Sequence, residues 1–93
     1  MEPERIVRGI SEAFEVEKEA LLKRGYKGVG RSVLMEMLYR HGGMNQREIG
    51  ELMGIDYSSV SVARKRLLGA QEKDRKLFAK IARLSQRLAE SQE

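Results

Sequence analysis

The sequence predicts an all-α fold of five to six helices with a central helix-turn-helix. Apolar residues recur at three- and four-residue spacing along most of the chain, which is the period of a helix that is buried on one face. No stretch alternates apolar and polar residues long enough to indicate a strand. The single proline, Pro3, stands where the first turn of a helix tolerates it.

The first half of the chain is predicted to form three helices. In the first, Ile6, Ile10 and Phe14 recur every fourth residue and therefore share one face. The elements that follow are a short helix over 16–23, a glycine-rich basic loop over 25–30 and a helix over 31–41 that the pair Gly42-Gly43 ends.

The helix-turn-helix is predicted over residues 45–68. Asn45 followed by Glu48 is a capping-box pair, which starts a helix that runs to about Met53. Gly54 supplies the left-handed residue that ends this helix. Asp56 can then cap the second helix, which is expected over 57–68, and Gly69 leaves open whether it stops there.

Gly50 distinguishes a helix-turn-helix from a plain pair of helices. A glycine in a helix interior costs about 1 kcal/mol, and a plain αα-hairpin gives no reason for that cost. In a helix-turn-helix the helices cross steeply, so the first needs a small residue where the second passes close. The inner angle is then expected to be sealed by apolar residues: Ile49, Met53, Ile55, Val60 and Ala63.

The charge of the chain favours an anionic partner. Lysine and arginine number 18 against 14 acidic residues, which gives a net charge of +4. Residues 25–47 carry four basic groups against one acidic group, so the positive charge gathers after the N-terminal segment. The chain has no cysteine, no apolar run that could span a bilayer and no signal-peptide core. We therefore expect one cytoplasmic, nucleoid-associated domain over 1–93.

The outward face of the second helix is predicted to meet duplex DNA. Short polar side chains near a helix N-terminus can reach base edges, while the N-terminus itself and nearby cations hold phosphates. On this interpretation Tyr57, Ser58 and Ser61 read bases, and Asp56 caps the helix. The residues expected to hold phosphates are Arg31, Arg47, Arg64 and Lys65.

The same segment resembles the C-terminal DNA-binding domain of the bacterial replication initiator DnaA, in the Trp-repressor-like superfamily. The stretches that carry the resemblance are EIG at 48–50, DYSSV at 56–60 and ARK at 63–65. The run REIGELMGIDYSSVS is also similar to the domain that follows the catalytic domain of REP-associated tyrosine transposases. The resemblance implies a Trp-repressor/DnaA C-terminal-domain-like fold and sequence-specific binding of double-stranded DNA.

The resemblance also implies contacts for single residues. In the initiator, the loop before the central helix sends an arginine into the minor groove, and Lys27 and Arg31 are the nearest basic groups here. Gln46 and Arg47 would touch the DNA backbone, and the run 56–59 would meet base edges and phosphate. Because the turn is one residue shorter and Ile55 replaces a basic residue, the initiator's target sequence is not expected. The candidate DNA-binding residues are Lys27, Arg31, Gln46, Arg47, Asp56, Tyr57, Ser58, Ser59, Ser61, Arg64 and Lys65.

No catalytic site, metal, cofactor or small-molecule substrate is expected. Residues 25–32 come close to the sequence pattern of a phosphate-binding loop. Arg31 stands where that pattern needs a lysine, however, and no predicted strand precedes the loop. His41, the only histidine, lies on an apolar helix face, where a core or capping role is expected.

A C-terminal helix is predicted at about 71–89 from the spacing of Leu77, Ile81, Leu84 and Leu88. The stripe is expected to pack on this domain, because it spans fewer heptads than a stable coiled coil needs. Two alternatives to binding of duplex DNA stay open. In the first, the chain is a non-catalytic protein-interaction module that forms a weak homodimer through this helix. In the second, it binds hairpin nucleic acid. No membrane partner is expected.

Overall fold

The computed structural model describes residues 1–23 and 28–90. Within these ranges every regular element is a helix and no strand is present, which confirms the predicted all-α class. The six described helices are α1 (Pro3–Phe14), α2 (Lys18–Leu22), α3 (Gly30–His41), α4 (Gln46–Met53), α5 (Tyr57–Lys73) and α6 (Arg75–Glu90). None of these helices is both long enough and apolar enough to cross a membrane.

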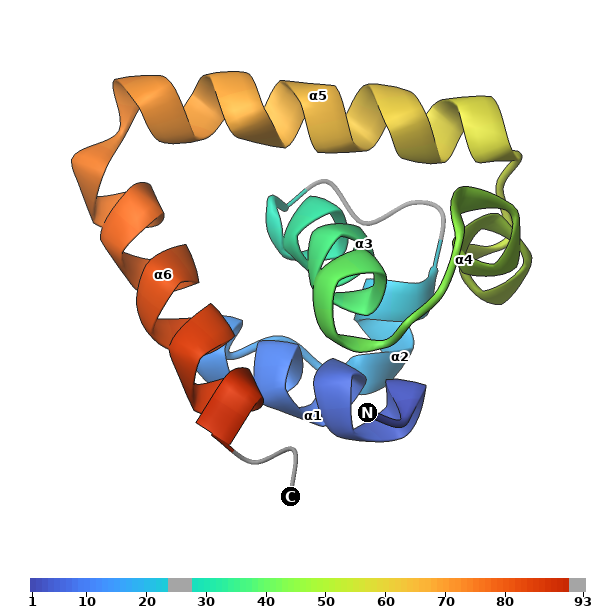
Figure 1. Cartoon of the computed structure of the whole chain (residues 1–93), viewed down its shortest axis with the longest axis horizontal. Coiled ribbons are helices and arrows are strands. Elements are labelled where there is room, and N and C mark those ends of the chain that lie inside the picture. Colours follow the sequence, from blue (N-terminus) through green and yellow to red (C-terminus); the bar gives the residue numbers. More distant parts are fainter. Residues whose placement is uncertain (24–27, 91–93) are drawn as a thin grey trace.

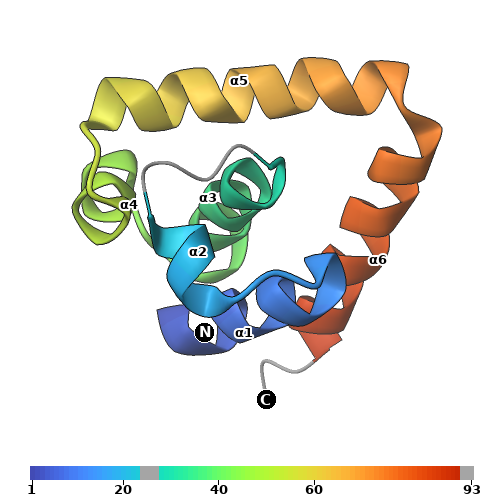
Figure 2. The same cartoon turned by 180° about the vertical axis from the view of Figure 1, so that it is seen from behind.

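Helix α3 lies at the centre of the molecule and packs against each of the other five described helices (Figure 1). Helix α5 passes along one side of α3, and α1 lies on the opposite side (Figures 1 and 2). Helix α4 lies beside the N-terminal end of α5, while α6 leads from the other end of α5 towards α1. The core is built around the fully buried residues of α3, namely Val33, Leu34, Met37 and Leu38.

The predicted caps are present at the corner between α4 and α5. Asn45 Oδ1 accepts a hydrogen bond from the Glu48 N–H at 2.8 Å, and Glu48 Oε1 accepts one from the Asn45 N–H at 3.0 Å. Gly54 ends α4 in the left-handed conformation, with a φ of 73°. Asp56 Oδ1 then accepts a hydrogen bond from the Ser59 N–H at 2.8 Å and caps α5. The chain therefore contains the predicted helix-turn-helix.

Gly50 fixes this corner through contact between two backbone segments. Its carbonyl oxygen accepts a hydrogen bond from the Ile55 N–H at 2.9 Å. A Cβ atom on Gly50 would lie 2.6 Å from the Ile55 carbonyl oxygen, which is too close for any side chain. The predicted need for a small residue is confirmed, although the segment that approaches it is the turn. The predicted apolar seal is also present, with buried Ile49, Met53 and Val60 and partly buried Ile55 and Ala63.

The C-terminal helices differ from the prediction in their boundaries. Helix α5 continues through Gly69 to Lys73, which answers the question that Gly69 left open and extends the helix five residues beyond the expected range of 57–68. A Cβ on Gly69 would meet nothing within 4 Å, so this glycine marks no close approach and the helix passes through it. Helix α6 begins at Arg75, later than expected, because Asp74 Oδ1 accepts a hydrogen bond from the Leu77 N–H at 3.1 Å and caps the helix there.

The apolar stripe of α6 packs inside the molecule. Ile81, Leu84 and Leu88 are buried, and Leu77 is partly buried against the same core. The prediction that this stripe packs on the domain is confirmed. The alternative of a weak homodimer through this stripe does not fit the arrangement, because such a dimer would need the stripe on the surface.

Arg31 has a structural position instead of the predicted contact with a DNA phosphate. The residue is only 7 % exposed. Its Nη1 donates hydrogen bonds to the carbonyl oxygens of Leu21 and Lys23 at 3.0 and 2.7 Å, and its Nη2 donates one to that of Met53 at 3.1 Å. These carbonyls lie at the C-terminal ends of α2 and α4, where a helix has no donors of its own for them. The guanidinium of Arg31 therefore binds helix ends, and the predicted phosphate contact is corrected.

We expect Gly50→Ala to lower the free energy of unfolding by about 1–3 kcal/mol, as overpacking of a close contact does. The new Cβ would meet a backbone oxygen, which cannot rotate away as a side chain can. Urea unfolding followed by the helical circular dichroism signal measures the change. Gly69→Ala is the matched control, because it places the same methyl group in open space, and it should raise stability by up to about 1 kcal/mol. Equal shifts in the two variants would contradict the role given to Gly50.

We expect Arg31→Lys to lower the free energy of unfolding by about 2 kcal/mol. The ammonium group keeps the charge but cannot reach the carbonyls at the ends of both α2 and α4 at once. The same urea titration measures this change. Arg47→Lys, at the exposed start of α4, is the control and should shift stability by less than about 0.5 kcal/mol. A loss at Arg31 no larger than the loss at Arg47 would refute the structural role.

Candidate nucleic-acid interface

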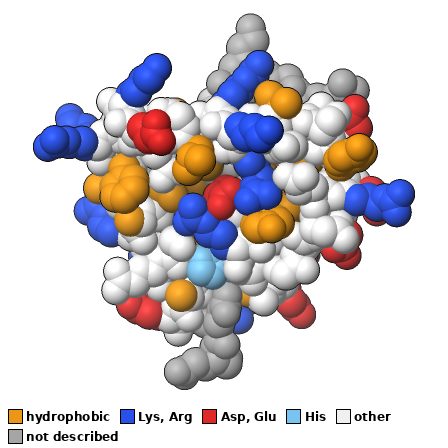
Figure 3. Space-filling model, turned by 45° about the horizontal axis from the view of Figure 1, so that its top comes forward, with side chains coloured by type: hydrophobic (Ala, Val, Ile, Leu, Met, Phe, Trp, Pro, Cys, Tyr) orange, Lys and Arg blue, Asp and Glu red, His pale blue; other side chains and the backbone are white. Residues whose placement is uncertain are grey.

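The N-terminal half of α5 forms much of the exposed surface of the helix-turn-helix. Figure 3 shows the molecule with α5 turned towards the viewer, and basic side chains are spread over this side. Tyr57 is 64 % exposed and Val62 is 46 % exposed. Ser58 and Ser59 are also exposed, and Ser61 is half-buried. Most of the residues expected to read bases therefore lie at the surface of one helix.

The start of α5 is held by hydrogen bonds within the motif. Asp56 Oδ1 accepts hydrogen bonds from the Ser59 N–H at 2.8 Å and from the Ser58 hydroxyl at 3.1 Å. The carboxylate of Asp56 thus serves as the helix cap that the sequence predicts. The Ser58 oxygen keeps lone pairs that can still accept a hydrogen bond.

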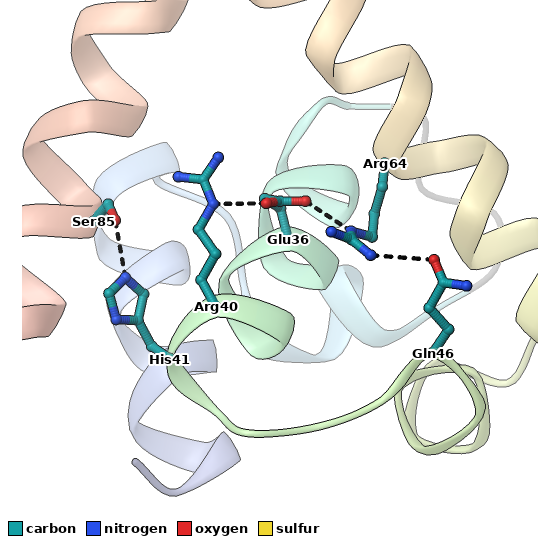
Figure 4. Close-up of polar contacts among 6 residues, drawn as sticks. All are labelled: Glu36, Arg40, His41, Gln46, Arg64 and Ser85. Atoms are coloured by element: carbon teal, nitrogen blue, oxygen red, sulfur yellow. Dashed lines mark hydrogen bonds and ion pairs between the residues drawn. The ribbon is translucent and has the colours of Figure 1, made fainter.

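Arg64 belongs to a polar network that joins α3, α4 and α5 (Figure 4). Its Nε donates a hydrogen bond to Glu36 Oε1 at 2.7 Å, and its Nη1 donates one to Gln46 Oε1 at 3.2 Å. Its guanidinium carbon lies 3.7 Å from the centre of the Tyr39 ring, which is a cation–π contact. The side chain is 22 % exposed. Arg64 is therefore positioned by three other residues, two of which come from α3.

Glu36, Tyr39 and Arg40 of α3 take part in the site although they are absent from the predicted residues. Glu36 Oε2 accepts a hydrogen bond from Arg40 Nε at 2.6 Å, so one carboxylate binds arginines from two helices. The four-residue spacing of Glu36 and Arg40 within a predicted helix is a signal for their pairing. The contact with Arg64 has no such local signal.

The polar network lines a groove of about 330 Å³ between α3, α4 and α5. Its walls carry basic residues and one candidate base-reading residue, Ser61. The lining residues are Glu36, Arg40, Gln46, Ser61, Arg64, Lys65, Leu67, Leu68 and Gln71. The groove is thus mixed in charge, with one carboxylate among three cations.

Of the remaining basic candidates, Lys65 lines this groove and Arg47 does not. Arg47 and Lys65 are exposed on α4 and α5, and neither forms an ion pair within the described part of the chain. Lys27 lies outside the described residues. The structure thus brings together candidates from α4 and α5, while Arg31 lies inside the protein.

His41 lies at the C-terminal end of α3 beside the network (Figure 4). Its Nε2 is 2.9 Å from the Ser85 hydroxyl of α6, and its carbonyl oxygen accepts a hydrogen bond from the N-terminal amine of Met1 at 3.1 Å. Burial lowers the pKa of His41 below its usual value, and the charges of Arg40 and of the N-terminal amine lower it further. The imidazole is therefore neutral at pH 7, and the positive charge of this side comes from arginine and lysine. Among the described residues, no group of three His, Cys, Asp or Glu side chains could hold a metal ion.

Comparison with known proteins gives one family match, and it lies on this site. The sequence model of the MarR family matches residues 30–71, which span α3, α4 and most of α5 and make up less than half of the chain. MarR proteins are winged helix-turn-helix DNA-binding proteins, so the match supports a helix-turn-helix of the DNA-binding type. It gives no support to the narrower resemblance to the replication initiator or to the transposase-associated domain. No curated protein matches the chain.

Proposed function

We propose that this chain binds double-stranded DNA sequence-specifically through α4 and α5, without catalysis. The observation that carries the proposal is the corner at Gly50, which holds α4 against the turn and leaves the polar N-terminal half of α5 exposed. A helix held in this way can enter the major groove, whose width admits an α-helix.

Within this proposal, residues of α5 divide between reading bases and holding phosphates. Tyr57, Ser58 and Ser61 are the base-reading residues, because their short or planar polar groups lie on the first two turns of α5. Arg47 and Lys65 hold phosphates on either side, since both are exposed. The N-terminus of α5 adds backbone N–H groups for a phosphate, and Ser59 lies in that first turn.

Asp56 keeps its predicted cap, while Gln46 and Arg64 take changed roles. Asp56 caps α5 and sets the position of Ser58, so it acts on DNA recognition through its neighbour. Gln46 and Arg64 bind each other and bring α4 and α5 together at the groove. Lys27 keeps its predicted place in the minor groove as part of the proposal, and Arg31 is withdrawn from it.

The wider setting of the chain is also part of the proposal. The segment 46–65 resembles the domains of the replication initiator and of the transposases. We propose on this basis that the chain is related to one of these two groups of DNA-binding proteins. We expect residues 1–93 to act as one domain, because α1 and α6 pack against α3 beside the helix-turn-helix. A protein that binds DNA in this way is expected in the cytoplasm, close to the nucleoid.

We expect Lys65→Gln and Ser61→Ala to weaken DNA binding in two different ways. Loss of a phosphate contact at Lys65 should weaken binding to every duplex alike and reduce the salt slope by about one. Loss of the Ser61 hydroxyl should instead reduce the preference for the selected site, by about 1–3 kcal/mol at the base pair it contacts. Selection of a site from a random duplex pool, followed by anisotropy titrations at several salt concentrations, measures both effects.

Lys18→Gln on α2 is the control for the loss of a lysine charge, because Lys18 is exposed on a helix outside the motif. If Lys65→Gln and Lys18→Gln weaken binding equally, α5 is not the DNA-binding surface. If the selection enriches no sequence and the parent chain binds no duplex at low salt, the proposed function is wrong.

A further inference from the structure

A single carboxylate lies between two arginines in the groove where α3, α4 and α5 meet. Glu36 Oε2 accepts a hydrogen bond from Arg40 Nε at 2.6 Å, and Glu36 Oε1 accepts one from Arg64 Nε at 2.7 Å (Figure 4). The Glu36 side chain is 12 % exposed, so water screens it less than a carboxylate on the surface. Guanidinium groups bind phosphate oxygens with the same charge-assisted hydrogen bonds.

We infer that Glu36 occupies the place of a DNA phosphate in the free protein, and that duplex binding transfers Arg40 from Glu36 to a phosphate. Glu36 therefore lowers the affinity of the chain for duplex DNA of any sequence. The inference rests on the proposed function and deepens it, because it concerns how the same surface is regulated from within.

Arg40 is the arginine that can leave Glu36. Its side chain is 39 % exposed, and among the described residues Glu36 is its one hydrogen-bond acceptor. Arg64 is also bound by Gln46 and by the ring of Tyr39, and its side chain is 22 % exposed. Transfer of Arg40 to a phosphate thus breaks one ion pair, whereas transfer of Arg64 would break contacts between three helices.

Glu36 lies in the same groove as two of the residues that we propose contact DNA. It lines the same groove as Ser61 and Lys65, which we assign to a base edge and a phosphate. A phosphate held by Lys65 therefore lies near the carboxylate of Glu36, and the two negative charges repel each other.

We expect Glu36→Gln to tighten binding of a labelled random-sequence duplex roughly three- to tenfold, because one negative charge near the phosphates is lost while the side chain keeps its size. The plot of log Kd against log salt should steepen by up to about one. Anisotropy titrations at several salt concentrations measure both quantities. Glu12→Gln is the matched control, since it makes the same change on α1, across α3 from α5, and should alter binding little (Figure 1).

Arg40→Gln tests the transfer itself, alone and together with Glu36→Gln. Alone it should weaken binding roughly threefold, more than Arg8→Gln on α1 does. In the double variant the gain from Glu36→Gln should be smaller than in the parent background, because the freed arginine is absent and only the loss of repulsion remains. An equal gain in both backgrounds would overturn the transfer of Arg40. Arg40 is exposed, so Arg40→Gln can be compared with Arg8→Gln even if Glu36→Gln fails to fold. If Arg40→Gln and Arg8→Gln weaken duplex binding equally, the inference is overturned as well.

The outcomes separate this inference from the proposed function. If the parent chain binds duplex and Glu36→Gln binds it equally or more weakly, the inference is wrong and the proposed function stands. If the parent chain binds no duplex at low salt, both are wrong.

Discussion

The buried guanidinium of Arg31 is the interaction on which the position of the helix-turn-helix depends. From the first turn of α3 it binds carbonyl oxygens at the C-terminal ends of α2 and α4. Those ends carry the partial negative charge of the helix dipole, and a planar group with five donors suits several carbonyls at once. Because Gly50 lies against the turn that leads into α5, the position that Arg31 gives to α4 also contributes to where α5 lies, together with the direct packing of α5 on α3. The surface proposed for DNA is therefore positioned from inside the protein.

The basic residues consequently divide between the interior and the surface. Arg31 binds carbonyl oxygens at helix ends, and Arg64 is held by a carboxylate, an amide and an aromatic ring. A net charge of +4 thus says little about the charge that a polyanion meets. Among the described residues of α3, α4 and α5, the exposed cations include Arg40, Arg47, Lys65 and Arg66, and the carboxylate of Glu36 lies against Arg40.

Features that depend on neighbouring residues are predictable from this sequence, and features that depend on distant ones are not. The capping box at Asn45, the left-handed Gly54 and the small residue at Gly50 are local, and the structure has all three. The sequence leaves the end of α5 open at Gly69, because a glycine in an open helix position looks the same in sequence as one that ends a helix. The inward direction of Arg31 and the pairing of Glu36 with Arg64 depend on packing between helices, which residue spacing does not encode.

The contact between Gly50 and the turn separates the geometry of the motif from the chemistry of its surface. The close approach of α4 to the turn before α5 is a contact between backbone atoms, so it does not depend on the exposed side chains of α5. Position 57, which is 64 % exposed, can therefore change in polarity or size without altering that contact, whereas the Ser58 hydroxyl also supports the cap at Asp56. A scaffold of this kind can acquire a new target by substitution at a few exposed positions, with no adjustment of the fold beneath them.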